Sequence, residues 1–190
     1  MRYSIYLVIF LLSACSSVST PDSHYYRLSS VEITNKLISI DNVFKVSPFK
    51  VEGLLNTNNL LYIDKSRPNE LKQFHYHQWH ASLSSVVTEN FIEFISKRTS
   101  ARIVEYDYKS FDGYLIQPSI KTMEIQYADS SASLVLHIEF IVKQKGKVIM
   151  AKTFKASKIS PTKDIYQLVS QYNELLQEIF TKFVEEISLL

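Results

Sequence analysis

Three of the five histidines in the chain crowd into six positions, at His75, His77 and His80. Neutral imidazole nitrogens are common ligands of transition metals, so this H-x-H-x-x-H spacing raises the hypothesis of a zinc or copper site. A catalytic zinc site also needs a positioned acid or base, such as the glutamate of H-E-x-x-H, and none stands at that spacing here. We therefore favour surface or interface histidines, and keep a metal-dependent hydrolase centred on them as an alternative that requires bound metal.

Whether the three histidines converge depends on the elements that carry them. The chain's only tryptophan, Trp79, opens a stretch up to Arg98 in which apolar residues recur every three or four positions, which predicts an amphipathic helix. If that helix begins near Trp79, His75 and His77 lie on a preceding extended segment and point to one side, whereas His80 lies in the first turn. Nothing forces the imidazoles to meet. Trp79 itself is expected in the core, because it falls on the buried phase of the helix.

Short segments rich in β-branched and aromatic residues predict a sheet on both sides of this helix. The expected strands cover residues 25–28, 37–46, 59–66, 70–77, 101–108, 113–127, 132–144 and 147–156. The last three are joined by short turns and predict an antiparallel meander, and Ser160-Pro161 is typical of the N-cap and first turn of a final amphipathic helix. We predict an α+β fold, with an antiparallel or mixed β-sheet and the two helices packed on one face.

The N-terminal residues predict export and lipidation. A basic Arg2 precedes an apolar run that is too short to span a membrane and fits the h-region of a signal peptide. The tetrad from Leu12 to Cys15 is similar to the lipobox of bacterial lipoproteins. That similarity implies cleavage before Cys15 and attachment of diacylglycerol and a further acyl chain, such as palmitate, to this cysteine. A plain secretory signal with an incidental cysteine is the alternative.

These features divide the chain into three parts. Residues 1–14 are the expected signal peptide, 15–24 a lipidated polar tether, and 25–190 a single domain, because the length suits one domain with a real core. The tether stretch "SSVSTPDSH" spans at most roughly 30 Å. A domain held that close to one membrane does not reach the other membrane alone. Cys15 is the only cysteine, which excludes an internal disulfide and every multi-cysteine zinc motif.

Composition excludes further classes of function. The net charge is +2, from 21 basic and 19 acidic residues, and no dense Lys/Arg run appears, so nucleic acid is not an expected partner. No phosphate-binding loop, nucleophile elbow, dinucleotide fingerprint or kinase motif is present. We therefore expect a protein that is not an enzyme and carries no cofactor.

Taken in order, the motifs of the mature chain resemble those of the ABC-type transport auxiliary lipoproteins. The resemblance covers essentially the whole mature chain. The residues that carry the resemblance are Tyr25, Tyr26 and Leu28 in the opening strand, Leu61-Tyr62 before a polar loop, and Trp79 with Leu83 at a helix start. Gln78 stands where an arginine is usual in the family, and His80 where an acidic residue often follows the tryptophan.

This resemblance implies a non-catalytic accessory or docking subunit. Its partners would be an MCE-domain protein and an ABC transporter permease complex that move lipids between the inner and outer membranes. Ser16, directly after Cys15, implies sorting to the outer membrane, with the domain facing the periplasm. The alternative is an outer-membrane lipoprotein that assists another envelope complex, for secretion or cell-wall synthesis. The sequence leaves open which lipid moves, in which direction, whether this subunit touches it, and whether the protein is a homo-oligomer.

Overall fold

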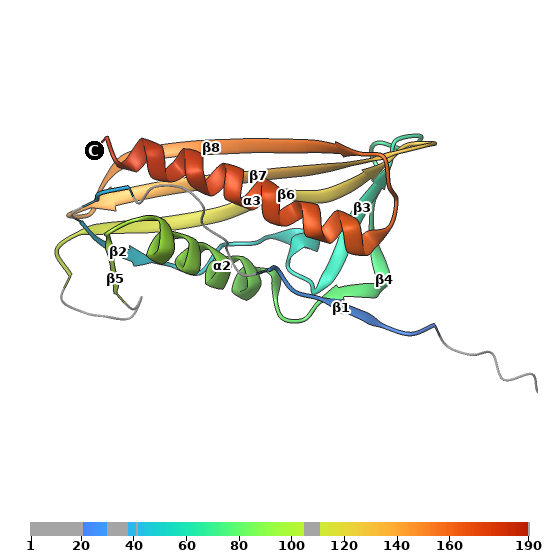
Figure 1. Cartoon of the computed structure of the whole chain (residues 1–190), viewed down its shortest axis with the longest axis horizontal. Helices are drawn as coiled ribbons and strands as arrows, with labels where there is room; N and C mark the ends of the chain where they lie inside the picture. The colour runs from blue at the N-terminus through green and yellow to red at the C-terminus, as the bar shows by residue number, and fades with distance from the viewer. Residues whose placement is uncertain (1–20, 30–37, 41, 105–110, 190) are drawn as a thin grey trace, which may run out of the picture.

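Two antiparallel hairpin connections build the longest part of the sheet. A computed structural model describes residues 21–29, 38–40, 42–104 and 111–189, and these form one mixed eight-stranded sheet with two helices (Figure 1). In chain order the elements are β1 (His24–Tyr26), β2 (Val43–Val46), the 3-10 turn η1 (Gly53–Leu55), β3 (Asn59–Asp64), β4 (Leu71–Trp79), α2 (Leu83–Arg98), β5 (Arg102–Val104), β6 (Tyr114–Tyr127), β7 (Ala132–Gln144), β8 (Lys147–Ser160) and α3 (Ile165–Ile187). The predicted α+β class with a mixed sheet is confirmed.

Strand β6 is the axis of the sheet. Along one side it pairs antiparallel with β7, which pairs in turn with β8, so the predicted meander is confirmed. Along its other side it pairs parallel with β2 near its start and with β3 near its end. Beyond β3 lie β4 and then β1, and beyond β2 lies β5. The predicted hairpin of β3 with β4 is confirmed. Of the expected strand over 37–46, the described residues form β2 and an isolated bridge at Ile38.

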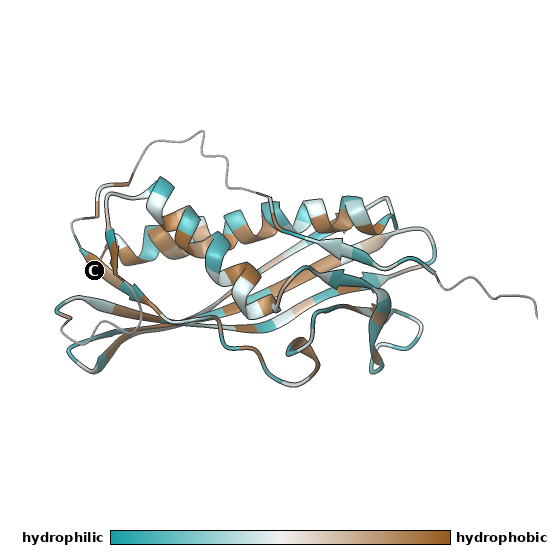
Figure 2. Ribbon diagram, turned by 90° about the horizontal axis from the view of Figure 1, so that it is seen from below, coloured by the Kyte–Doolittle hydropathy of each residue, from teal (hydrophilic) through white to brown (hydrophobic). Residues whose placement is uncertain are grey.

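Both helices cover the same face of the sheet (Figures 1 and 2). The brown, apolar sides of α2 and α3 face the sheet, and their teal sides face outward (Figure 2). Five phenylalanines form the centre of this layer, and each exposes 1% of its surface or less; they are Phe49, Phe91, Phe140, Phe180 and Phe183. The rings of Phe140 and Phe183 stack at 4.0 Å between β7 and α3. Sheet and helices therefore share one aromatic core, as expected for an α+β layer.

The two helix starts differ from the prediction. Helix α2 begins at Leu83, where the hydroxyl of Ser82 accepts a hydrogen bond from the Ser85 amide at 3.1 Å. Helix α3 begins at Ile165, capped by Asp164, because β8 keeps pairing with β7 as far as Ser160. In both places a polar side chain closer to the helix satisfies a first-turn amide.

The ends of the domain lie far apart. Strand β1 lies near the end of the molecule where α3 begins, and α3 ends at the opposite end (Figure 1). In the described part of the chain, neither helix is long and apolar enough to cross a membrane. A tether attached before β1 would thus hold the domain by one end of its long axis.

Candidate functional site

The histidine-rich segment forms a wide bulge in β4. Asn59 of β3 pairs with Gln78, but Leu61, only two residues further, pairs with Gln73. One residue of β3 therefore lies opposite the four residues 74–77 of β4. A bulge of this kind bends the strand and turns its side chains away from the regular alternation.

His77, at the end of the bulge, packs against residues of β1. The parallel register places His24 opposite His77, and the two imidazole rings stack at 4.9 Å with an angle of 11° between them. The hydroxyl of Tyr26 lies 2.8 Å from Nδ1 of His77, and Phe74 meets the His77 ring edge-on at 5.5 Å. His77 is thus held by three rings from two strands.

The other two histidines of the segment do not join this group. His75 is exposed on β4. His80 follows the strand, where its amide and its Nδ1 both donate to the carbonyl oxygen of Tyr26, at 2.8 and 3.2 Å. In the described residues no set of three His, Cys, Asp or Glu side chains is placed to hold a metal ion. The H-x-H-x-x-H spacing thus does not become a three-histidine metal site in this fold.

The Tyr26–His77 pair has the electrostatics of a neutral hydrogen bond. Burial, together with the nearby His24, lowers the pKa of His77. Burial, and then the Asp164 carboxylate, raises the pKa of Tyr26. Both shifts favour the uncharged forms, so the tyrosine donates to a neutral imidazole. Such a pair joins β1 to β4.

Trp79 ends β4 rather than opening α2, which corrects the expected helix boundary. Its amide donates to the carbonyl oxygen of Asn58 at 2.6 Å, and its side chain exposes only 2% of its surface. The indole meets the ring of Tyr172 on α3 at 6.4 Å. The expectation that Trp79 is a core residue is confirmed, although a strand and not a helix positions it.

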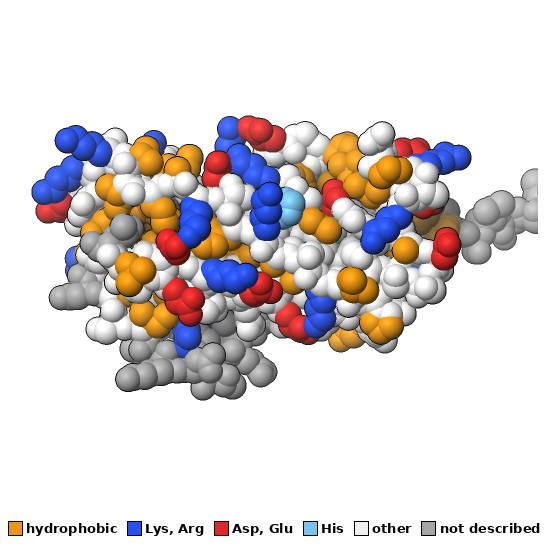
Figure 3. Space-filling view, turned by 90° about the horizontal axis from the view of Figure 1, so that it is seen from above, with side chains coloured by type: hydrophobic (Ala, Val, Ile, Leu, Met, Phe, Trp, Pro, Cys, Tyr) orange, Lys and Arg blue, Asp and Glu red, His pale blue; other side chains and the backbone are white. Residues whose placement is uncertain are grey.

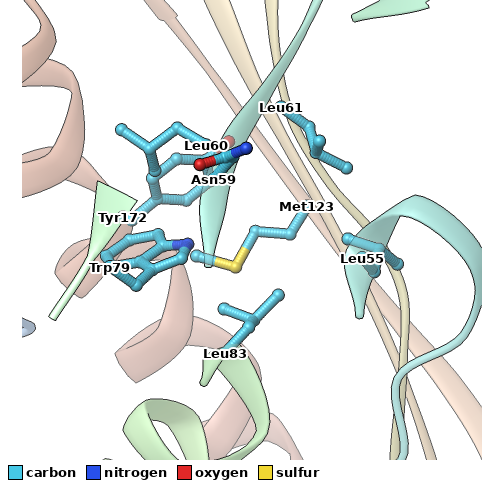
Figure 4. Close-up of a pocket in the computed structure, with 8 residues that line it drawn as sticks. All are labelled: Leu55, Asn59, Leu60, Leu61, Trp79, Leu83, Met123 and Tyr172. Carbon is cyan, nitrogen blue, oxygen red and sulfur yellow. The ribbon is translucent and has the colours of Figure 1, made fainter. Parts of the chain in front are cut away.

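A small cavity lies beside Trp79. Figure 4 shows the indole and the rings and chains around it converging on this space, from η1, β3, β4, α2, β6 and α3. Its lining is Leu55, Asn59, Leu60, Leu61, Trp79, Leu83, Met123 and Tyr172. Only about 10 Å³ is open to a water-sized molecule, enough for roughly one water. The cavity is a packing defect in the core and is too small for a lipid or a substrate.

A larger pocket lies on the surface between β1 and the first half of α3. We call it the tether pocket, because its lining includes residues 23–27, which run from the end of the expected tether through β1. Ser29 and, from α3, Tyr166, Val169, Ser170 and Asn173 complete the lining. Its volume of about 640 Å³ lies within the range of small-molecule sites. This pocket is the best candidate for a binding site that the described residues offer.

The tether pocket could not be predicted from the sequence pattern. Its two walls are more than 130 residues apart, and they meet because the Ser29 amide donates to Oδ1 of Asn173 at 2.9 Å. Residues 25–28 are predicted as a strand, but the sequence pattern specifies neither its pairing with β4 nor its distance from α3. Cys15, the expected lipidation site, lies outside the described residues.

The charged side chains on the β8 side of the molecule are mixed in sign. Figure 3 shows lysine, acidic and apolar side chains interspersed over this face, without a continuous basic stripe. Lys152 and Lys158 of β8 each form an ion pair with a glutamate of α3, Glu186 and Glu174 respectively. This face therefore lacks the uncompensated basic surface that nucleic-acid binding requires.

Several solved structures share this fold. Protein XCC0632 from Xanthomonas campestris is 13% identical, with a TM-score of 0.75 over 88% of this chain and 95% of that one. An uncharacterized protein is 12% identical, with a TM-score of 0.72 over 88% of this chain and 99% of that one. Protein CT253 from Chlamydia trachomatis is 10% identical, with a TM-score of 0.51 over 78% of this chain and 96% of that one.

The comparison with protein families identifies the family of this chain, whereas the solved structures show only its fold. Among curated proteins, none matches this chain. The model of the family described as "ABC-type transport auxiliary lipoprotein component" matches residues 26–183, from the end of β1 to the last turns of α3. That match includes the bulged strand, Trp79 and one wall of the tether pocket. The chain belongs to the family of ABC-type transport auxiliary lipoproteins.

Proposed function

We propose that this protein is a lipid-anchored, non-catalytic docking subunit of an MCE/ABC-type system that moves lipids between the two membranes of the envelope. The observation that carries the proposal is the family match over residues 26–183, preceded at a short distance by the lipobox-like tetrad that ends at Cys15. The family gives the association with an ABC transport system, and the MCE-domain partner is our inference. Protomers could act singly or as a homo-oligomer within this proposal.

The proposed anchor is the acylated Cys15 in the outer membrane, with residues 1–14 removed and 15–24 as the tether. Two or three acyl chains make a stable anchor, whereas one chain alone would be marginal. The tether spans at most roughly 30 Å, so the domain stays near its own membrane and faces the periplasm. A partner that bridges the periplasm must then come to the domain, which is the reason for proposing a docking role.

Lipidation is tested by labelling cells with a palmitate analogue. The wild-type protein should take up the label and sediment with outer-membrane fractions. Cys15→Ala should lose the label, while Ser16→Ala, the neighbouring substitution, should retain it. Label on the Cys15→Ala protein would contradict the anchor, and sedimentation of the wild type with inner membranes would contradict the proposed location.

The docking role is tested by photo-crosslinking in cells. A benzoylphenylalanine residue in place of Val148, which is 56% exposed at the start of β8, probes the end of the domain far from the tether. The same residue in place of the buried Phe140 is the control that should capture no partner. Recovery of an MCE-domain protein by mass spectrometry supports the proposal. Recovery of secretion or cell-wall synthesis proteins in its place would contradict it and favour a role in another envelope complex.

A further inference from the structure

We propose that the tether pocket binds the headgroup of an anionic phospholipid from the membrane that holds Cys15. This inference rests on the lipid anchor of the proposed function, but not on the identity of the transport partner. It concerns the membrane beneath the domain and assigns no role in carrying transported lipid.

Position is the first argument. The pocket begins at Ser23, only eight residues after Cys15, and so lies within roughly 30 Å of the anchored cysteine. A short tether creates a high effective concentration of membrane around any surface that it can reach. Weak contacts in the tether pocket are therefore sufficient to orient the domain, provided that their chemistry suits a headgroup.

Charge is the second argument. Arg27 lines the pocket, is exposed, and forms no ion pair with any residue in the described part of the chain. His24 also lines it, and among the described residues no carboxylate lines it, the nearby Asp164 acting on Tyr26 from outside the lining. Tyr26 and Asn173 are engaged by His77 and Ser29, and the other polar side chains of the lining are hydroxyls, which suit phosphate and glycerol oxygens. A guanidinium is the side chain best fitted to a phosphate, with which it forms paired hydrogen bonds.

The aromatic residues are the third argument. Tyr25 and Tyr166 flank the pocket from its two walls and expose 65% and 74% of their surfaces, an unusual exposure for large side chains. Tyrosine is enriched where one end of a side chain meets apolar material and the other meets water, as at a membrane surface. Between them Val169, which exposes 4%, gives an apolar floor.

The walls of the pocket are held in place before any ligand binds. The Ser29 amide and Asn173 join β1 to α3, and the stacked His24 and His77 join β1 to β4. Binding therefore needs little ordering of the chain, which favours affinity for a small headgroup.

The test uses the full lipidated protein in nanodiscs of pure phosphatidylcholine and of an equal mixture of phosphatidylcholine and phosphatidylglycerol. Hydrogen exchange of residues 21–29 and 165–173 should slow by about five-fold in the mixed nanodiscs, the change expected for one arginine at an anionic surface. Arg27→Gln should abolish the difference. Lys155→Gln, which removes an exposed cation from β8, should leave it unchanged.

Equal exchange in both kinds of nanodisc would overturn the proposal, as would a persistent difference in Arg27→Gln. Millimolar inorganic phosphate added to phosphatidylcholine nanodiscs separates the two sources of phosphate. Protection by phosphate equal to that by phosphatidylglycerol would indicate a site for free anions and would overturn the assignment to lipid. Because no transport partner is present, failure here leaves the MCE crosslinking result unaffected, and a protein without acyl chains would be recognised by its failure to enter the nanodiscs.

Discussion

Replacing Trp79 with alanine tests the view that this residue is a core element rather than a ligand-contacting one. An aromatic side chain buries about 150–250 Å² on folding, and at about 25 cal/mol per Å² this corresponds to roughly 4–6 kcal/mol. Trp79 is 2% exposed and packs against Tyr172, so nearly all of that area is removed from water. Part of the loss is recovered as neighbours relax, so we expect Trp79→Ala to lower the free energy of unfolding by about 3–5 kcal/mol.

The assay is urea denaturation followed by circular dichroism, because the variant loses the only tryptophan and with it the fluorescence signal. Tyr76→Ala is the matched control, since Tyr76 lies on the same strand but is 43% exposed and should change stability by less than about 1 kcal/mol. For a domain of this size, the Trp79 variant should melt roughly 6–20 °C lower. A loss of stability below about 1 kcal/mol, similar to that of the control, would refute the core assignment and favour a role for Trp79 in contacting a ligand.

Three further changes probe the strands around the sheet. Burial, and then the nearby His24, lowers the pKa of His77, so the unfolded chain binds more protons than the folded chain below about pH 6.5. Hydrogen exchange of the β1 and β4 amides should therefore show full protection above that pH and a progressive loss of protection below it. A Cβ on Gly113 would lie 2.4 Å from the carbonyl oxygen of Val43, so Gly113→Ala should push β2 from β6 and lower the free energy of unfolding by about 1–3 kcal/mol in urea denaturation. At Gly146 a Cβ meets nothing within 4 Å, but φ is +78°, so Gly146→Ala should lose about 1 kcal/mol in the same assay, through the backbone alone.

Each of these results has a matched comparison. His77→Gln should flatten the pH dependence of the β1 amides, while His137→Gln, on β7, should leave it in place although the pKa of His137 is also lowered by burial and by Lys155. An unchanged profile in His77→Gln would contradict the assignment to that ring. For the glycines, Gly53→Ala, at φ +60° with open space around it, should match Gly146→Ala and fall short of Gly113→Ala. If all three glycine variants lost the same stability, the steric argument for Gly113 would fail.

The sequence predicted the parts of the fold that depend on local pattern. Strand β7 has the bounds expected from its alternation, because every second residue from Ala132 points to the same buried face. Helix α2 carries the expected apolar stripe. The predicted start of α2 was wrong because Trp79 and Leu83 are four residues apart and both are buried. That spacing matches a helix, although a turn separates the two residues. The capping hydroxyl of Ser82 was the better signal, because it acts directly on the first amides of the helix.

The parts that could not be predicted depend on pairing between distant segments. β1 pairs with β4 in parallel about 50 residues along the chain, and nothing in three residues of strand specifies a partner or a register. That one pairing stacks His24 on His77, carries Arg27 and Tyr25 toward α3, and so creates the tether pocket. The three histidines are close in sequence, which suggests a metal site, but the fold packs His77 against His24 and Tyr26 of β1, while His80 contacts the Tyr26 carbonyl oxygen. The same pairing fixes β1 to the sheet, so if Cys15 is acylated as proposed, a force on that anchor would act on β1 and on the pocket that it lines.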